Sequence, residues 1–317
     1  MRPGESNLAQ DLRSDLDAFS RNIRPLPGIT NKANLEALVE QMVESIRRIR
    51  FVSVIDGQAL SPLRADPASD IFDPLRAAVL RKRSGLIEEA FWLVFLSVHF
   101  GKSSRTGWRL VRDIYRGLGG GASWDWTQTS ANPTAFSHWL STNYATLKGG
   151  DGIRRQFGNH RKYETLDPSS LRATGKVVCS YVDWVLPPRS HQQLVQDALS
   201  QSGGDGRKAF DYLYRSMNKV ISFGRTARFD YLTMLGKLGL AAIEAGSAYM
   251  TGATGPLKGA RLLFGGNPSA ALSASGLDAW LIELEAHMSL SPQGMQVLED
   301  ALCNWQKSPG QFLPFRS

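Results

Sequence analysis

The chain has 317 residues, of which 42% are hydrophobic and 21% charged, and its formal net charge is +8. This composition is typical of a globular protein and argues against long disordered regions. The most apolar stretch, residues 90–100, is too short to span a membrane, and the first residues lack a secretory signal. We therefore expect a cytoplasmic protein that does not contact membranes.

The excess positive charge is confined to the first 250 residues, which hold 33 Lys and Arg against 24 Asp and Glu. One basic cluster is usually a solvated helix face, whereas several together favour a surface that follows the phosphates of a nucleic acid. The clusters lie at residues 47–50, 81–83, 102–116, 154–155, 160–162 and 215–228.

The first predicted elements are a lead-in and a helix. Residues 1–30 are polar and end in a turn rich in proline and glycine, so we expect an N-terminal lead-in there and a helical domain over 31–317. From Asn31, which can cap a helix, apolar residues recur at three- and four-residue steps up to Ile49. This period predicts an amphipathic helix.

Helices dominate the rest of the chain. The apolar segment 88–97 predicts a central buried helix, and glycine-rich turns follow at 117–123 and 149–152. Strand signals are few, the clearest being at 52–55, so the sequence predicts an all-α fold. Further helices are expected over 75–82, 106–115, 176–186, 192–199, 209–220, 229–243, 277–287 and 292–305.

The sequence lacks the common metal and nucleotide motifs. None of its five histidines stands at the spacing of a metal site, and Cys179 and Cys303 are far apart. No glycine pattern matches a phosphate-binding loop or a dinucleotide fingerprint. We therefore expect no metal and no organic cofactor.

The glycine-punctuated segment 249–266 predicts a hairpin between two helices. Gly252 and Gly255 enclose two residues, and Lys258 and Gly259 follow within the next turn. Backbone N–H groups at the start of the second helix can bind a DNA phosphate, because glycines let it approach closely and the lysine adds a charge. A plain turn between two helices explains the pattern equally well.

Asp278 stands at the start of an apolar helix, 23 residues after Gly255. A structural interpretation makes it the cap of that helix. The order of hairpin, helix and acid also resembles the helix-hairpin-helix family of DNA glycosylases. That resemblance implies two helical lobes with a DNA-binding cleft between them, a hairpin that binds the phosphate beside the lesion, and a catalytic aspartate downstream.

Two further resemblances sharpen this interpretation. His99 stands where the leucine-leucine-serine-x-glutamine helix of these glycosylases has the glutamine that enters the DNA stack. Four longer strings resemble clade 3 of the α-glutamyl/putrescinyl-thymine pyrophosphorylases, a glycosylase-related family linked to hypermodified pyrimidines in phage DNA. The strings are residues 98–102, 157–164, 225–232 and 255–260. This resemblance implies bacterial or phage biology and, in some relatives, removal of bulky modified bases as antiviral defence.

The combined expectation is a DNA glycosylase that flips a bulky modified pyrimidine out of double-stranded DNA and leaves an abasic site. Glucosylated 5-hydroxymethylcytosine is the first candidate substrate. Asp278 is the expected catalytic carboxylate, with Asp230 in reserve, because positive charge develops on the sugar as the bond breaks. Leu257, not Lys258, falls where related lyases have a lysine nucleophile, so strong lyase activity is not expected. The residues expected to contact DNA or the flipped base are His99, Lys102, Asn159, His160, Arg161, Lys162 and Tyr163.

Two other functions stay open. One is a transferase or pyrophosphorylase that takes part in the hypermodification of thymine in DNA, which leaves the modified base attached. The other is a DNA-binding protein without catalytic activity. In each case the expected partner is double-stranded DNA, and no obligatory protein partner is evident from the sequence.

Overall fold

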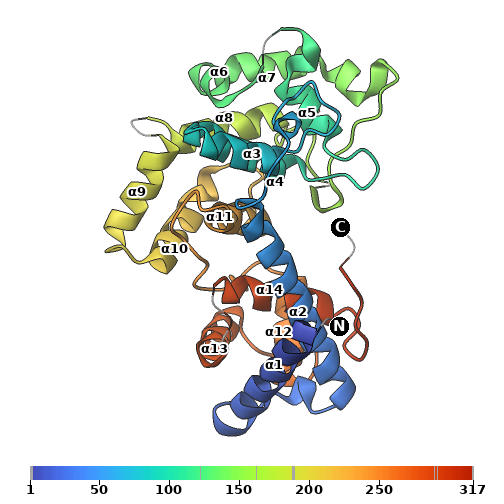
Figure 1. The fold of residues 1–317 in the computed structure, drawn as a ribbon, viewed down its shortest axis with the longest axis vertical. Helices are drawn as coiled ribbons and strands as arrows, with labels where there is room; N and C mark the ends of the chain where they lie inside the picture. Colours follow the sequence, from blue (N-terminus) through green and yellow to red (C-terminus); the bar gives the residue numbers. More distant parts are fainter. Residues whose placement is uncertain are drawn as a thin grey trace. The chain divides into compact units, whose positions relative to one another are not determined.

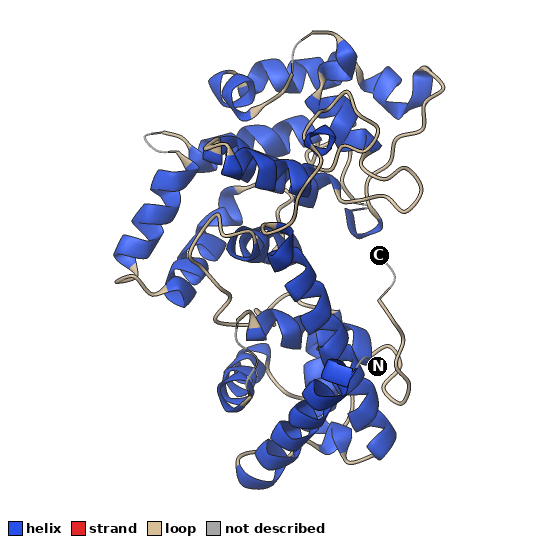
Figure 2. Ribbon diagram, viewed as in Figure 1, coloured by secondary structure: helices blue, strands red, loops and turns tan. Residues whose placement is uncertain are grey.

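The computed structural model describes residues 3–121, 123–161, 163–187, 190–288, 290 and 292–315. Over these residues the chain forms fourteen α-helices and no strand, and only two isolated β-bridges occur (Figure 2). The all-α prediction is confirmed. None of the helices described is both long and apolar enough to cross a membrane.

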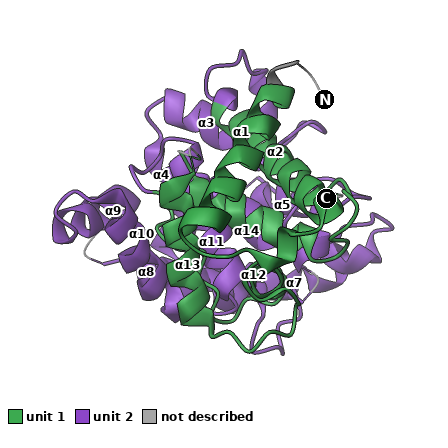
Figure 3. Ribbon diagram, turned by 90° about the horizontal axis from the view of Figure 1, so that it is seen from below, with its two compact units in different colours: residues 1–53, 244–316 green, residues 54–243, 317 purple. Residues whose placement is uncertain are grey.

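The chain divides into two compact units (Figure 3). Unit 1 joins the two ends of the chain, residues 1–53 and 244–316, and unit 2 is the continuous segment 54–243. The helices of unit 1 are α1 (Pro3–Asn22), α2 (Lys32–Ile55, which runs on into unit 2), α12 (Gly255–Gly265), α13 (Ala274–His287) and α14 (Gly294–Trp305) (Figure 1).

Unit 2 holds the remaining nine α-helices of the described chain. They are α3 (Pro74–Arg83), α4 (Ile87–Phe100), α5 (Arg109–Tyr115), α6 (Trp126–Ala131), α7 (Pro133–Thr142), α8 (Thr174–Val185), α9 (His191–Gln201), α10 (Gly206–Ser216) and α11 (Arg225–Lys237) (Figure 1).

Helix α1 lies within the expected lead-in and was not predicted. Its buried residues Ala9, Leu12, Leu16 and Phe19 follow each other at three- and four-residue steps, so one face packs into unit 1. The helix was missed because the segment is polar on average, and its average composition does not reveal the regular spacing of these four residues.

Helix α2 confirms the amphipathic helix predicted from residue 31. Asn31 accepts a hydrogen bond from Ala33 N at 2.8 Å, as expected of a capping residue. The strand signal at 52–55 is wrong, because the helix continues through these residues to Ile55. A short β-branched run at the end of a long helix is not enough to stop it.

Helix α4 is the centre of unit 2. Every residue from Ala90 to Phe100 is buried, which confirms the predicted central helix. Its aromatic residues stack on those of neighbouring helices; the ring of Phe95 lies 3.7 Å from that of Tyr181 on α8, measured between centroids. Burial on all sides explains why this segment reads as apolar throughout rather than as amphipathic.

A chain of hydrogen bonds crosses the core beside α4. Glu88 accepts from His191 Nδ1 at 2.6 Å, Tyr181 donates to His191 Nε2 at 2.6 Å, and Tyr231 donates to Tyr181 at 2.9 Å. Burial alone would raise the pKa of Glu88, but the hydrogen bonds from His191 and the adjacent backbone lower it to about 2. This hydrogen-bond chain thus runs from a carboxylate through a neutral histidine to two tyrosines, and each of these four side chains has a polar partner.

Candidate nucleic-acid interface

Two of the strings that carried the family resemblance lie side by side in unit 2. Gly158 N donates to Phe100 O at 2.8 Å. A Cβ at Gly158 would lie only 2.8 Å from the carbonyl carbon of Gly101, so the two backbones touch. Residues 98–102 and 157–164, far apart in sequence, therefore meet through glycines.

Arg161 joins the third string to this pair. Its guanidinium donates from Nε to Val98 O at 2.5 Å and from the other end to Asp230 at 2.7 Å. Its side chain is mostly buried, whereas that of Asp230 is 43% exposed. We call residues 98–102, 157–164 and 225–232 the three-segment cluster.

The cluster exposes several of the residues that we expected to contact DNA. Asn159 and His160 lie in a short 3-10 turn on the surface, and Lys102 is also exposed. The side chain of Tyr163 is 75% exposed. Lys162 lies outside the described residues.

His99 does not have the expected position. The sequence predicts that it enters the DNA stack, but only 1% of the residue is exposed, and its ring stacks on that of Phe95 within the core. Burial lowers its pKa to about 3, with a further contribution from the charge of Arg161. The wedge assignment is therefore wrong for this structure, because tertiary packing covers the side chain.

The hydrogen bonds around His99 fix its tautomer. Thr174 Oγ1 donates to Thr165 O at 3.0 Å, so it accepts from His99 Nε2 at 3.1 Å. The other ring nitrogen, Nδ1, is a buried acceptor 3.9 Å from Glu164 Oε2, which is too far for a hydrogen bond. His99 is thus a neutral core residue.

A helical hairpin that the sequence did not predict lies in unit 2. Helices α10 and α11 are joined by residues 217–224, which we call the 217–224 hairpin (Figure 1). Met217, Val220 and Phe223 anchor it, since all three are buried. The sequence signal was this three-residue apolar spacing followed by a glycine.

The tip of the 217–224 hairpin faces outward. Lys219, Ile221 and Gly224 are exposed, and a Cβ at Gly224 would meet no atom within 4 Å. Gly224 occupies the N-cap position of α11 and, as a glycine, has no side chain that could cap the helix. Such a terminus favours an anion, because its first N–H groups lack intrahelical partners.

A hydrogen bond joins the hairpin to the three-segment cluster. Ser222 Oγ donates to Glu164 Oε1 at 3.0 Å, while Ser222 itself has a φ of +63°, which is unusual for a residue with a side chain. Burial raises the pKa of Glu164, although this hydrogen bond acts in the opposite direction. The hairpin, the cluster and the exposed polar residues therefore form one continuous region.

The hairpin expected at 249–266 is only half formed. Residues 238–254, all of which the structure describes, contain turns but no helix, so α12 has no helical partner in front of it. Ser247 and Gly252 favour local turns, and the side chain of Asp278 binds the backbone of this segment instead of leaving it to form a helix.

The glycines of α12 serve helix packing. A Cβ at Gly255 would lie 2.7 Å from Cys303 Sγ, and one at Gly259 would lie 2.3 Å from Leu302 O. Both glycines thus allow α12 to approach α14 closely. Gly252 is different: its φ is +79°, and a Cβ there would meet nothing within 4 Å, which is typical of an exposed turn. Lys258 is exposed on the same helix.

Asp278 is not the N-cap of its helix. Ser273 caps α13, and Asp278 lies one turn further in. Its Oδ1 accepts from Ser247 Oγ at 2.9 Å, and its Oδ2 accepts from Met250 N at 3.0 Å. The carboxylate therefore holds the turn before α12, all within unit 1, whereas the other expected acid, Asp230, belongs to unit 2.

Comparison with protein families gives a match over most of the chain. The sequence model of a family described as alpha-glutamyl/putrescinyl thymine pyrophosphorylase clade 3 covers residues 33–317. The chain belongs to this family. Neither the curated proteins nor the solved structures include a match.

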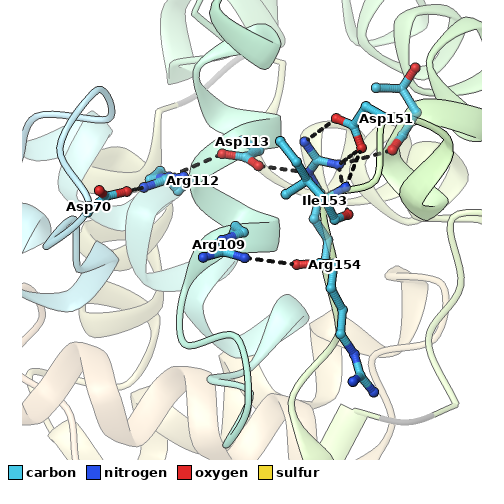
Figure 4. A network of polar contacts seen from close by, with 9 residues as sticks. Asp70, Arg109, Arg112, Asp113, Asp151, Ile153 and Arg154 are labelled. Atoms are coloured by element: carbon cyan, nitrogen blue, oxygen red, sulfur yellow. Dashed lines mark hydrogen bonds and ion pairs between the residues drawn. The ribbon is translucent and has the colours of Figure 1, made fainter.

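This clade 3 member uses some of its basic clusters internally. Arg155, whose side chain is 2% exposed, donates to Asp113 at 2.7 Å and to Asp151 at 2.8 Å, and Arg112 links Asp113 to Asp70 (Figure 4). Arg112 and Arg155 are therefore committed to an ion-pair network that joins α5 to the turn after α7.

Other clusters of the clade 3 chain are also partly paired. Lys82 binds Asp56 at 2.8 Å, Arg161 binds Asp230, and Arg215 binds Asp211 at 2.9 Å. The count of basic residues in the sequence thus overstates the number that can bind phosphate. Within the described residues, no group of three or more His, Cys, Asp and Glu is arranged to hold a metal ion.

Proposed function

We propose that the chain is a DNA glycosylase that removes a modified pyrimidine from double-stranded DNA. The observation that carries the proposal is the 217–224 hairpin, in which the exposed Gly224 stands at the N-cap of α11 with no atom within 4 Å of the place of a Cβ. Backbone N–H groups in such a place hold a phosphate without reading the sequence. Lys219 at the tip adds a charge that favours the same ligand.

The surroundings of the hairpin support a nucleotide ligand as well as a phosphate. Asn159, His160 and Tyr163 offer hydrogen-bonding groups and an aromatic ring on the exposed side of the cluster. Proteins that act on extrahelical bases use such mixtures to read the base edge and to stack on the ring. These three residues are our candidates for contact with the extrahelical nucleotide.

Base removal also needs a carboxylate, which stabilises the positive charge that develops on the sugar and orients the attacking water. Asp278 and Asp230 are candidates from the sequence. The observed hairpin adds a third. The resemblance to the helix-hairpin-helix glycosylases implies a catalytic aspartate downstream of the hairpin, and Glu244, a glutamate in place of that aspartate, follows Gly224 by 20 residues. Asp230 is the weakest of the three because Arg161 neutralises it.

The test is release of free base from duplexes that carry single modified pyrimidines. The panel contains glucosylated 5-hydroxymethylcytosine, α-glutamyl-thymine and putrescinyl-thymine, with unmodified DNA as the control. We expect free base and alkali-labile abasic sites from at least one modified duplex. Little strand cleavage is expected without alkali, because strong lyase activity is not part of the proposal.

Single variants then identify the acid. We expect either Glu244→Gln or Asp278→Asn to abolish base release while DNA affinity is largely kept. Asp17→Asn, an exposed position on α1, is the matched control and should leave release unchanged. If purified protein releases no base from any duplex of the panel, the glycosylase proposal is wrong.

The family name favours a second candidate, a pyrophosphorylase-type enzyme in thymine hypermodification. This enzyme would join an amine to a pyrimidine that is activated as a pyrophosphate ester in DNA: the amine nitrogen bonds to the activated carbon, pyrophosphate leaves, and a larger base stays attached to its sugar. A further reaction, with a duplex that carries such an activated pyrimidine and with an added amine, distinguishes the two functions. Pyrophosphate release together with an increase in the mass of the intact DNA favours the second candidate, whereas free base favours the first.

A further inference from the structure

The loop that precedes α8 is closed at its base. Residues 165–174 leave and return at the same place, because Thr174 donates to Thr165 O from both N, at 2.9 Å, and Oγ1, at 3.0 Å. Thr165 and Ala173 also form an isolated parallel bridge. The base of the loop is also anchored to the core, because Thr174 accepts a hydrogen bond from the buried His99.

Short polar contacts also fix the inside of the loop. Asp167 accepts from both N and Oγ of Ser169, at 3.0 and 2.7 Å. Ser170 accepts from Arg172 N at 3.1 Å, and Lys176 Nζ donates to Ser170 O at 3.0 Å. These bonds leave the backbone of the tip few alternative conformations.

The tip of this rigid loop carries an apolar side chain. Leu171 is 83% exposed, more than any other large hydrophobic residue in the described part of the chain. A single exposed leucine is ordinary on a protein surface. Here, however, the hydrogen bonds of the loop hold the leucine at the surface in one position, and the exposed Arg172 follows it. We call Leu171 and the tip of this loop the projection.

The projection belongs to the same region as the 217–224 hairpin. Glu164, which directly precedes the loop, accepts from Ser222 of the hairpin. Ser180, six residues after Thr174 on α8 and so about 9 Å along that helix, accepts from Ile221 N at 2.9 Å. The hairpin therefore packs on both chain segments from which the loop emerges.

We propose that Leu171 is the wedge of this protein, the side chain that enters the base stack of DNA and fills the space of an extrahelical nucleotide. Insertion of apolar side chains between base steps unstacks and kinks a duplex. The hairpin would hold the strand while the fixed loop drives the leucine into it. The inference rests on the proposed function and replaces His99, which is buried, in the role of wedge.

A fluorescent duplex tests the wedge without depending on base release. The probe carries a tetrahydrofuran abasic analogue with 2-aminopurine as the adjacent base, whose fluorescence rises when it is unstacked. We expect the wild-type protein to raise the fluorescence and Leu171→Ala to lose most of that rise, with DNA affinity reduced much less. Leu171→Met should restore the rise, because methionine supplies a similar apolar volume.

Leu63→Ala is the matched control. Leu63 is also an exposed leucine of unit 2, 52% exposed, and it lies in the short 3-10 helix Pro62–Arg64, far in sequence from both the loop and the hairpin. It should behave as the wild type. In the base-release assay, Leu171→Ala should slow release by at least about tenfold, since unstacking is then no longer compensated.

The outcomes separate the two proposals. If Leu171→Ala unstacks the probe and releases base as the wild type does, the wedge is wrong and the glycosylase stands. If the wild type unstacks the probe through Leu171 but releases no base from any duplex, the glycosylase is wrong and the wedge stands. If the wild type does not bind the probe, or binds it without raising the fluorescence, the wedge is wrong, and the base-release reactions alone decide whether the chain is a glycosylase.

Discussion

Gly224 and Gly259 are two glycines of helical segments with opposite surroundings. A Cβ at Gly224 would meet nothing within 4 Å, and its φ of −70° suits any residue. A Cβ at Gly259 would lie 2.3 Å from Leu302 O, a backbone atom that cannot move aside easily. The first position is open toward solvent, and the second is closed by helix packing.

Alanine substitution should therefore separate binding from stability. We expect Gly224→Ala to leave thermal stability unchanged but to weaken DNA binding, since its methyl group would hold a phosphate off the N–H groups. Gly259→Ala should lower the free energy of unfolding by about 1–3 kcal/mol through overpacking. Thermal melts and binding titrations of both variants check this, and a destabilised Gly224→Ala variant would contradict it.

His99 should make stability depend on pH. The unfolded chain binds a proton at this residue below pH 6.5, whereas burial keeps the folded residue neutral down to about pH 3. The stability that its neutral form contributes is therefore fully present above pH 6.5 and declines as pH falls, by up to about 1.4 kcal/mol per pH unit.

The variant His99→Gln tests this sign. Glutamine can still donate to Thr174 Oγ1, but it does not titrate. We expect the free energy of unfolding from urea titrations to fall less steeply for the variant than for the wild type between pH 6.5 and pH 5. Parallel pH profiles for the two proteins would show that His99 is not the group responsible.

At the scale of single elements, the sequence predicted most helices because their apolar residues recur regularly. Helices α2 and α4 are where the period and the uniform apolar run placed them. The hairpin was misplaced, since the glycines at 255 and 259 look alike in sequence whether they face a phosphate or a neighbouring helix. Only the packing of α14 decides between these uses.

The candidate site was predicted only in part. The strings of the three-segment cluster were recognised by resemblance, and the structure brings them together through Gly158 and Arg161. The burial of His99 could not be predicted, because a histidine at the end of an apolar helix carries no sign of what covers it. Nor does the sequence distinguish Leu171 from a core leucine.

The 217–224 hairpin leads to a prediction about salt dependence. Lys219 at its tip should contribute one phosphate contact, so Lys219→Ala should weaken binding to all duplexes alike and lower the slope of log affinity against log salt by about 1. Lys307→Ala, on an exposed lysine of unit 1 that contacts Asn304, is the control. A change in base preference, rather than a uniform loss, would mean that Lys219 reads the base.

For the whole molecule, net charge is a poor guide to DNA affinity because so many cations have acidic partners. Arg112, Arg155 and Arg161 all bind carboxylates. We expect the affinity for DNA to fall between 50 and 200 mM salt by less than the factor of about 10³–10⁵ typical of six to ten phosphate contacts. Binding titrations at several salt concentrations measure this, and a steeper dependence would show that these ion pairs open on DNA.

Unit 1 is assembled from both ends of the chain, and this has a consequence for biosynthesis. Helices α1 and α2 leave the ribosome first, but their partners α12 to α14 are made last. Unit 2, which is continuous, can fold during translation, whereas the apolar face of α1 stays exposed to solvent until α12 to α14 have been synthesised. A polypeptide that stopped at residue 243 would contain all of unit 2 and an N-terminal arm prone to aggregation, so a late nonsense mutation should cost solubility as well as activity.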